Sequence, residues 1–572
     1  MERETPLEFT RRAVLTGMVL GAALTPCNVY SGLKIGWSFN MSIAAGLLAV
    51  GAWRLAGRGL GTAPFDLREN NINQTAASAS ASIVSGGLVA PIPALTLLTG
   101  QTFEWPVLAF WVFSVSILGV VVAAGLRRQM IEHENLAFPA GLATAETLRR
   151  IHGAGREQAG RLRALLAAAG VSAAAKLAVD LAAAVPRLAL PGGFAGGVTF
   201  RNLGLAFDPS LLMIGFGALI GPRAGLSLLL GAVAAWGVLA PWVLDRGWAR
   251  PGAADAVWFS DLVGWLLWPG VTLTVVSALT SFALSVLRLR RRLAGTGGLG
   301  GRIGRGYVLA LGSVTALICV AGWALFGLPV WVSVLAVGLS YVLAVIAARV
   351  SGETGVTPVG ALGKVTQLTY GAVTPGDVAA NLMTANVTGG AAGQCADMMH
   401  DLKTGHIVGA TPRLQLYAQA FGVLTGSLAG AAVYLVLVPD PGAMLMTPEW
   451  PAPAVATWKA VAEVLSAGLG AIPEGTAPAM AVAAVLGLIL GAADRLLPEP
   501  VARFLPSAPA AGVAFVIPAW NSFSLCLGAV IAALAAYLRP EWTARYGTAL
   551  AAGLVAGESL IGVALAFRGM AG

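Results

Sequence analysis

Long apolar runs recur along the whole chain, and short polar or basic segments separate them. One run covers 106–126 and ends at Arg127 and Arg128, and another covers 261–287 and ends in the basic sequence RLRRRL. A helix needs about 20 apolar residues to cross the hydrocarbon core of a bilayer, so each of these runs is long enough to span. Because only helices and closed barrels satisfy their backbone hydrogen bonds in lipid, the pattern predicts an all-α, polytopic integral membrane protein.

The composition supports this class and predicts one domain. Only 11% of the 572 residues are charged and 57% are hydrophobic, with a mean hydropathy of +0.77. A soluble domain has about a quarter of its residues charged. Since no polar stretch is long enough to form a domain of its own, we expect a single transmembrane domain over 1–572. A Gly-rich cytoplasmic connection, 294–304, is expected to join two halves, 1–293 and 305–572.

The net charge of +9 indicates membrane orientation rather than a nucleic-acid partner. Lys and Arg gather at the ends of the apolar runs, as the positive-inside rule requires, and this predicts a cytoplasmic N-terminus. The four cysteines are Cys27, Cys319, Cys395 and Cys526, which are far apart and form no C-x-x-C pair. We therefore expect no disulfide framework, no metal site and no cofactor.

Two segments are too polar and too broken to be simple lipid-facing helices. The first, 61–95, begins with amides and continues as a run of Ala and Ser, and the second, 351–413, holds several charges and three prolines. Broken backbone at membrane depth must be buried in protein or line a water-filled cavity. We therefore expect both segments to belong to a substrate pathway. A further break is expected at Pro518, which brings the prediction to about 14–16 membrane segments, including broken or re-entrant helices.

Short matches between the two halves suggest an internal repeat. The sequence NINQTAASASASIVSGG at 71–87 corresponds to NLMTANVTGG at 381–390, and both end in Gly-Gly. FPAGLATAETL at 138–148 corresponds to TPVGALGKVTQL at 357–368. Broken segments at matching positions of two halves are typical of transporters. A two-half pseudo-repeat is therefore our expectation.

Four acidic residues are candidates for proton coupling. A coupling carboxylate needs a partly apolar pocket, and acids inside membrane helices are costly enough that a functional role is the default. Glu353, which follows an apolar run and lies between glycines, is the first candidate, and Asp377, Asp397 and Glu558 follow it. For Glu558, a hydrogen bond that packs two helices is an equally good explanation.

The polar segments also supply candidates for binding a zwitterionic or anionic substrate. Lys364 is expected either to hold a substrate carboxylate or to pair with Glu353. The neutral candidates have an alternative role in hydrogen bonds between helices, and those near residue 70 have an alternative position in a cytoplasmic loop. The remaining candidates in these segments are Glu69, Asn70, Asn73, Gln74, Asn381, Thr384, Asn386 and Thr388.

The chain resembles the oligopeptide transporter family, which includes the yellow-stripe-like carriers of metal chelates. The resemblance rests on five motifs spread over nearly the whole length: NVYSGLKIGWSFN (28–40), RENNINQTAASA (68–79), FPAGLATAE (138–146), GETGVTPVGALGKVTQL (352–368) and LVAGESLIGV (554–563). The matching motifs add Asn28, Tyr30, Lys34 and Gln367 to the substrate-binding candidates. The fourth motif is similar to the prokaryotic branch, which implies a prokaryotic plasma membrane.

This resemblance implies a proton-coupled importer of oligopeptides, surrounded by lipid. The alternative within transport is a carrier of metal–siderophore or metal–amino-acid chelates, which would be recognised through the organic part of the chelate. A passive channel and an intramembrane enzyme are weaker alternatives, since no filter repeat is present and the spacing of His400 and His406 suits no single helical face. We expect the chain not to be an enzyme, and leave open whether it forms a homo-oligomer.

Overall fold

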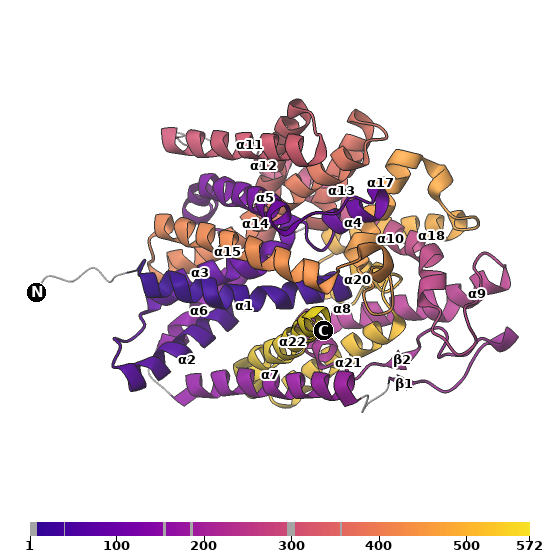
Figure 1. The fold of residues 1–572 in the computed structure, drawn as a ribbon, viewed down its shortest axis with the longest axis horizontal. Helices are drawn as coiled ribbons and strands as arrows, with labels where there is room; N and C mark the ends of the chain where they lie inside the picture. Colours follow the sequence, from indigo (N-terminus) through magenta and orange to yellow (C-terminus); the bar gives the residue numbers. More distant parts are fainter. Residues whose placement is uncertain are drawn as a thin grey trace, which may run out of the picture.

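The structure is a computed structural model that describes residues 8–38, 40–152, 156–182, 187–293, 304–354, 357 and 359–571. It is nearly all helical, and Figure 1 shows the helices arranged as a bundle. α11 and α12 lie along one edge of this bundle and α7 along the opposite edge. Most of the expected connection at 294–304 lies outside the described residues.

The helices of the first part of the chain are interrupted by short 3-10 or π-helical turns, labelled η. Their bounds are α1 Arg11–Ile35, α2 Ser42–Leu60, α3 Leu67–Ala81, η1 Ser82–Gly86, α4 Pro91–Thr99, α5 Trp105–Arg127, η2 Arg128–His133, α6 Pro139–His152, α7 Arg156–Ala182, η3 Ala195–Gly197, α8 Leu211–Ala232, η4 Val233–Leu239, α9 Ala240–Asp245 and α10 Phe259–Leu293. One antiparallel pair of short strands, β1 (Leu188–Ala189) and β2 (Ala206–Phe207), precedes α8.

The second part of the chain has helices as its regular elements within the described residues, joined by loops. Its bounds are α11 Arg305–Phe326, α12 Val330–Thr354, α13 Val359–Val373, α14 Val378–Val408, α15 Pro412–Leu437, α16 Pro441–Met444, α17 Pro453–Ala467, η5 Leu469–Ala471, α18 Ala477–Leu496, α19 Glu499–Ala502, α20 Ala508–Val513, α21 Ala519–Leu538 and α22 Pro540–Ala571.

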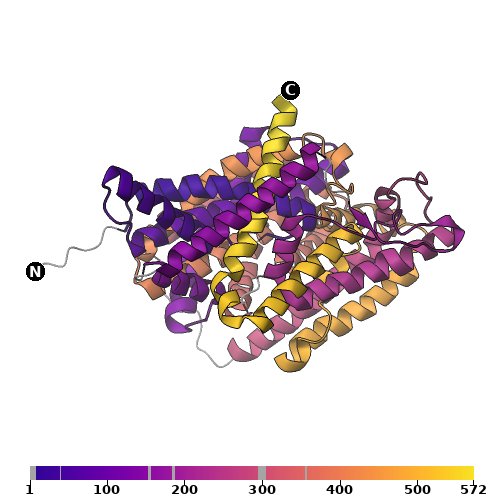
Figure 2. The ribbon, with the colours of Figure 1, turned by 90° about the horizontal axis from the view of Figure 1, so that it is seen from below.

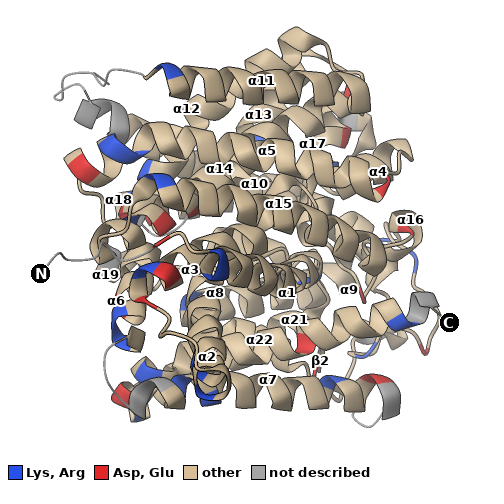
Figure 3. Cartoon of the chain, turned by 60° about the vertical axis from the view of Figure 1, so that its left-hand side comes forward, with Lys and Arg blue, Asp and Glu red and all other residues tan. Residues whose placement is uncertain are grey.

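Within the described residues, twelve helical segments are long and apolar enough to cross a membrane. This confirms the prediction of a polytopic, all-α membrane protein. α7, which sequence alone left between a span and an interfacial helix, contains one of these segments. It packs along α22, as Figure 2 shows from below. Figure 3 shows that most Lys and Arg residues lie toward helix ends, while the middle of the bundle is largely uncharged.

The expected helix breaks are present. α3 stops at Ala81, and the chain passes through η1 and the left-handed Gly87 before α4 begins at Pro91. Glycine is needed at position 87, because its φ is +114° and a Cβ there would lie 2.7 Å from the Asn386 side chain. Pro518 separates α20 from α21 by serving as the N-cap of α21. At Gly221-Pro222 the structure has a kink inside α8.

α3 and α14, which carry many amide and hydroxyl side chains, occupy the centre of the bundle and are buried along nearly their whole length. Small residues allow this close packing around α3. A Cβ on Gly17 or Gly21 of α1 would lie 2.6 Å from an atom of α3, and so would one on Gly426 of α15. Such small-residue contacts are the usual way for membrane helices to approach closely.

The two central helices each pack between two long helices. α3 packs between α1 and α15, and α14 packs between α12 and α5. Elsewhere in the bundle, α7 packs on α22 and α18 packs on α10. α11 contacts mainly α5 and α12.

Candidate functional site

Two groups of mainly buried polar side chains lie on and around α14, one near its beginning and one near its end. Each is held by neighbouring helices rather than by the Gly-rich middle of α14 itself. We call them the Lys364 cluster and the Asp401 cluster. The Lys364 cluster consists of Lys364, Gln367, Asn381 and Trp458, and the Asp401 cluster consists of Asp397, Asp401, Ser42, Gln74 and Gln415.

In the Lys364 cluster, a lysine is buried among amides and an aromatic ring. Lys364 is 3% exposed, and its Nζ donates to Gln367 Oε1 at 2.6 Å. The same nitrogen lies 4.3 Å from the centroid of the Trp458 ring, a cation–π contact. Lys364 forms no ion pair with any residue that the structure describes. Its charge is therefore solvated only by neutral groups, which is costly unless an anion joins them.

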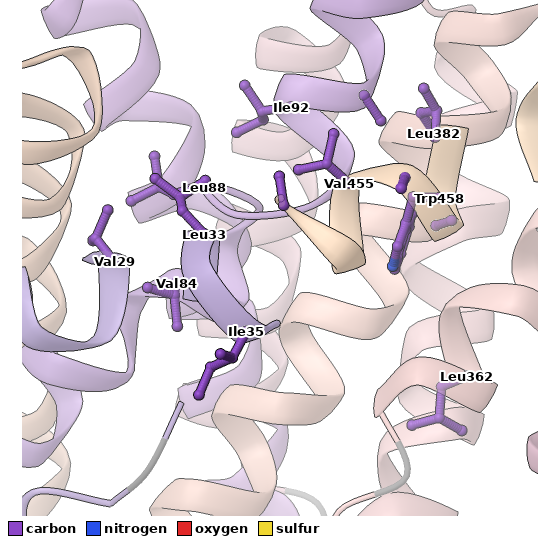
Figure 4. Close-up of a cluster of buried hydrophobic side chains, with 14 of the residues drawn as sticks. Val29, Leu33, Ile35, Val84, Leu88, Ile92, Leu362, Leu382, Val455 and Trp458 are labelled. Carbon is purple, nitrogen blue, oxygen red and sulfur yellow. The ribbon is translucent and has the colours of Figure 1, made fainter. Parts of the chain in front are cut away.

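The amides of this cluster are fixed by α14 and α17. Gln367 Nε2 donates to Asn381 Oδ1 at 3.1 Å and to the carbonyl of Trp458 at 3.2 Å. Asn381 Nδ2 returns a 2.7 Å bond to the carbonyl of Gln367. Figure 4 shows Trp458 within a larger cluster of buried apolar side chains, drawn partly from α1, α4 and α14 through Leu33, Ile92 and Leu382. The surroundings therefore hold the amides and the lysine in fixed positions.

In the Asp401 cluster, two carboxylates lie one turn apart on α14. Asp401 is 1% exposed, and its Oδ1 accepts from Ser42 Oγ at 3.3 Å, while Oδ2 has no partner among the described residues. Gln415 Nε2 donates to the Asp401 carbonyl at 2.8 Å. Asp397 is hydrogen-bonded by Ser82 of η1, at the break after α3. Neither acid forms an ion pair within the described part of the chain.

Two basic residues of the same helix turns point to other neighbours. His400 Nε2 lies 2.9 Å from Ser351 Oγ, and its ring packs edge-on against Phe138. Lys403 Nζ donates to Asn135 Oδ1 at 2.8 Å. Neither side chain therefore neutralises the two acids.

The structure places the first two coupling candidates at exposed helix ends. Glu353 lies exposed near the end of α12. Asp377 is also exposed, and its side chain caps α14 by accepting from Ala380 N at 2.8 Å. Glu558 is buried and caps α8, since it accepts from Ser210 Oγ at 2.7 Å and from Leu212 N at 2.8 Å. Of the four coupling candidates, only Asp397, which is partly exposed, lies beside a buried acid, Asp401, on α14.

The candidates near residue 70 are absorbed into the packing of α3. Glu69 completes a capping box at the start of α3 and pairs with Arg12. Asn70 donates to the carbonyl of Gly46 at 3.2 Å, and Asn73 donates to Asn70 Oδ1 at 3.1 Å. Gln74 Nε2 donates to Asn71 Oδ1 at 3.2 Å, but its Oε1 has no partner in the described structure. Of these residues, Gln74 alone belongs to the Asp401 cluster.

The remaining candidates lie on α1 and α14. Asn28 Nδ2 donates to the carbonyl of Ala81 at 2.9 Å, which ties α1 to the end of α3. Lys34 lies over the rings of Tyr30 and Trp450, 5.7 and 4.9 Å from their centroids.

On α14, Asn386 Oδ1 accepts from Trp111 Nε1 at 2.7 Å. Thr388 shares a 2.7 Å bond with Thr366, and Thr384 bonds its own helix at Ala380. Lys364, Gln367 and Asn381 are thus the substrate candidates that the structure brings together.

Asp401, Ser42, Gln415 and Trp458 are the members of the two clusters that sequence reasoning did not select. The signal available for Asp401 is its spacing of four from Asp397, which puts both acids on one helix face. For Ser42 no local signal exists, because α2 brings it to α14 from 359 residues away in the chain. Gln415 lies only 14 residues after Asp401, but its contact depends on how α15 folds back along α14.

Comparison with known proteins identifies the family. A family model described as OPT oligopeptide transporter protein matches residues 8–295 and 306–568. The chain belongs to this family. It is 24% identical to a putative oligopeptide transporter of Saccharomyces cerevisiae over 564 residues, covering 75% of this chain and 77% of the yeast protein. OPT proteins are transporters, which confirms that the chain is not an enzyme.

Plant relatives cover more of the chain. A probable metal-nicotianamine transporter of Oryza sativa subsp. japonica is 24% identical over 615 residues, covering 97% of this chain and 88% of the rice protein. The iron-phytosiderophore transporter yellow stripe 1 of Zea mays is 24% identical over 622 residues, covering 97% and 89%. This OPT protein is therefore similar to carriers of peptides and to carriers of metal chelates.

Proposed function

We propose that this OPT protein is a secondary active transporter that couples the import of oligopeptides to protons, in the plasma membrane of a prokaryote with its N-terminus in the cytoplasm. The observation that carries the proposal is a set of charges without counter-charges on two packed helices, of which Lys364 and Asp401 are buried and Asp397 is partly exposed. Lys364 on α13 has no anion, and Asp397 and Asp401 on α14 have no cation, within the described structure. Unneutralised charges inside a membrane protein are costly and mark substrate or proton pathways.

Each cluster suits one task of such a carrier. A lysine held by amides and a tryptophan face can bind an anionic group of a substrate. A carboxylate away from cations accepts a proton more readily than one in water, and two neighbouring carboxylates disfavour the doubly ionised state. We assign proton coupling to the Asp397–Asp401 pair. The exposed positions of Glu353 and Asp377 make them weaker candidates, and the capping contacts of Glu558 favour a structural role.

We also propose that residues 1–293 and 305–572 form two halves of opposite orientation. The packing of α3 and α14, each between two long helices, supports this proposal. The direction of the helices supports it as well. Thr411, at the start of α15, binds Glu8 just before α1, so α1 and α15 begin together. Arg349 near the end of α12 pairs with Glu134 just after α5, so α12 and α5 end together, and the bond of Lys403 on α14 to Asn135 places both contacts at the same end of the bundle. Inverted halves are a common basis for alternating access around a central site.

A second candidate is the uptake of metal chelates. The observation in its favour is that the metal-nicotianamine and iron-phytosiderophore transporters align over 97% of this chain. A chelate with free carboxylates would present to Lys364 the same anionic group as a peptide. Both substrates therefore fit the Lys364 cluster.

Uptake into proteoliposomes tests the proposal. The liposomes would carry an inward proton gradient, and the substrates would be a small peptide library and chelates of iron and nickel. We expect peptide accumulation above equilibrium that a protonophore abolishes, and that Asp401→Asn reduces at least tenfold. Glu353→Gln is the matched control and should keep accumulating peptide.

Other outcomes would contradict particular parts of the proposal. Equilibration that does not depend on the gradient would exclude coupling to protons. Gradient-driven accumulation of chelates without peptides would establish the second candidate. Loss of accumulation in Glu353→Gln, with normal accumulation in Asp401→Asn, would return the coupling role to Glu353.

A further inference from the structure

A cavity opens at one end of the bundle, away from the Lys364 and Asp401 clusters. Its volume is about 430 Å³, within the range of about 300–1,000 Å³ that is usual for small-molecule pockets. It is lined by Arg150 near the end of α6, by Arg161 near the start of α7 and by the first two turns of α22. The lining residues of α22 are Glu541, Trp542, Ala544, Arg545 and Tyr546. We call this cavity the arginine pocket.

The lining of the arginine pocket is mainly positive. Three arginines from three helices line it together with one acidic residue, Glu541. Arg161 is 9% exposed, so most of its side chain is removed from bulk water. Arg150 is more exposed and pairs with Glu146 one turn before it. The fork of an arginine side chain matches the oxygens of a phosphate, and three forks around one cavity suit a single phosphate group.

The arginine pocket lies where two membrane-spanning helices begin. Both α7 and α22 contain a spanning segment that starts beside it. Gly160 of α7 faces Tyr546 of α22, since a Cβ on this glycine would lie 3.0 Å from the tyrosine Oη. Further along, Ala169 faces Gly557, so the two helices run in the same direction. Trp542 is 46% exposed, as is usual for aromatic side chains at the level of lipid headgroups.

α6 connects the arginine pocket to the central helix α14. Gly141 of α6 fits against the backbone of His400, and Thr404 Oγ1 donates to the Gly141 carbonyl at 3.0 Å. Arg149 donates to the carbonyl of Ile407, just before the end of α14. The pocket therefore lies at the end of the bundle where α14 ends, which the proposed function places in the cytoplasm. Figure 3 shows basic residues near α6 and at the adjoining ends of α2 and α7.

We propose that the arginine pocket binds the phosphate group of an anionic phospholipid. Basic pockets between membrane helices on the cytoplasmic side bind such headgroups. The acyl chains would lie along the lipid-facing side of α7, where Leu166 and Val171 are exposed. A soluble phosphate ester carries the same group, but the depth of the pocket favours lipid. The bound lipid would tie α6 to two peripheral helices and so stabilise α14. The inference concerns a second site and does not depend on which substrate is transported.

Native mass spectrometry of the full-length protein in neutral detergent tests this. The probes are phosphatidylglycerol and phosphatidylcholine with identical acyl chains, and glycerol 3-phosphate as the soluble phosphate ester. Because only phosphatidylglycerol combines a net negative charge with acyl chains, we expect it to bind about tenfold more tightly than either of the other probes. It should also raise the unfolding temperature, whereas phosphatidylcholine should not.

Variants separate the arginine pocket from the general charge of this end of the bundle. Arg150→Gln and Arg545→Gln should each weaken the binding of phosphatidylglycerol about fivefold. Glu541→Gln removes an acidic lining group and should strengthen binding, a result that loss of stability cannot imitate. Arg128→Gln is the matched control and should bind lipid as the wild type does. Arg128 is an exposed arginine just after α5, at the same end of the bundle, and does not line the pocket.

Three outcomes would overturn the inference. The first is equal binding of the two lipids to the wild-type protein. The second is an equal loss of binding in Arg128→Gln and in the pocket variants, which would indicate attraction to the surface charge in general. The third is unchanged binding in all the pocket variants.

The soluble probe assigns the source of the phosphate. Binding of glycerol 3-phosphate as tight as that of phosphatidylglycerol, and weakened in the same arginine variants, would overturn the lipid assignment and leave a site for a soluble phosphate ester. All these measurements are made without substrate or proton gradient. Failure of the proposed function would therefore leave their results unchanged.

Discussion

Arg12 of α1 holds the carboxylate of Glu69 of α3, with Nε donating to Oε1 at 2.7 Å. Thr10 donates to the same oxygen at 2.6 Å, and Glu69 accepts from Asp66 N at 3.1 Å. Three residues therefore fix this buried acid at the point where α1 meets the start of α3. The contact explains how a charged residue is accommodated beside a central helix of the bundle.

Glu69→Gln should destabilise the protein while leaving the affinity for the transported substrate unchanged. Loss of one partner of a buried ion pair costs about 3–5 kcal/mol, but the Arg12 side chain is 25% exposed, so we expect about 2 kcal/mol. Thermal unfolding in detergent measures the change. If Glu69 contacted the substrate, affinity would fall in preparations of normal stability.

Lys364→Met should raise stability and abolish recognition of the peptide carboxylate. A lysine that is buried without an anion opposes folding, and an apolar side chain of similar length removes this cost, for a gain of about 1–3 kcal/mol. The measurement is the shift in unfolding temperature of the substrate-free protein. A fall in unfolding temperature would indicate that Lys364 serves the fold instead.

Two glycines should respond differently to the same substitution. A Cβ on Gly422 of α15 would clash with the backbone of Ala76, whereas a Cβ on Gly389 would meet only ordinary contacts. We expect Gly422→Ala to cost about 2 kcal/mol of stability through overpacking. Gly389→Ala should keep normal stability, measured by thermal unfolding in detergent. An equal loss of stability in the two variants would contradict the difference in packing.

His152 at the end of α6 should make stability depend on pH. Burial lowers the pKa of His152, whose Nε2 lies 3.1 Å from Asn70 Nδ2, and α6 is outside the spanning segments. The folded protein therefore favours the neutral imidazole. Stability should be constant above the usual histidine pKa of about 6.5 and should fall as pH decreases below it. His152→Gln should lose this component, measured by thermal unfolding between pH 8 and pH 5. An identical pH dependence in both proteins would exclude the effect.

Glu558→Gln tests the remaining acidic candidate. Its carboxylate caps α8 through Ser210 and Leu212, and loss of a helix cap costs about 1 kcal/mol. We expect a small fall in unfolding temperature and unchanged proton-driven uptake. Uncoupled uptake in this variant would instead assign a proton-carrying role to Glu558.

The helix breaks were predictable because their causes are local. Gly87, Pro91 and Pro518 act on the backbone next to them, and each lies where the structure interrupts a helix. Whether an acidic side chain is neutralised depends instead on residues that are distant in the sequence. Glu69 and Asp401 both lie in polar segments, yet Arg12 neutralises the first from 57 residues away, while no cation reaches the second within the described structure.

The same argument explains why Glu353 stood first among the coupling candidates. Its place after an apolar run suggested a pocket at membrane depth, but α12 carries it to an exposed end. Sequence gives the distance of a residue from the end of an apolar run and not the packing around it. Lys364 was recognisable as a carboxylate-binding candidate, whereas its isolation from Glu353 depended on the packing of α13, α14 and α17.

The position of α11 bears on how the two proposed halves are joined. α11 begins beside the end of α5, where Tyr307 contacts Gly125, and it delivers the chain to the opposite end of the bundle, where α12 starts. If α12 began where α11 begins, it would run in the same direction as α1, and the repeat would be parallel. One extra membrane crossing reverses the direction of every helix that follows it. A single peripheral helix would therefore let the two proposed halves, if their sequences are similar, enter the membrane from opposite sides.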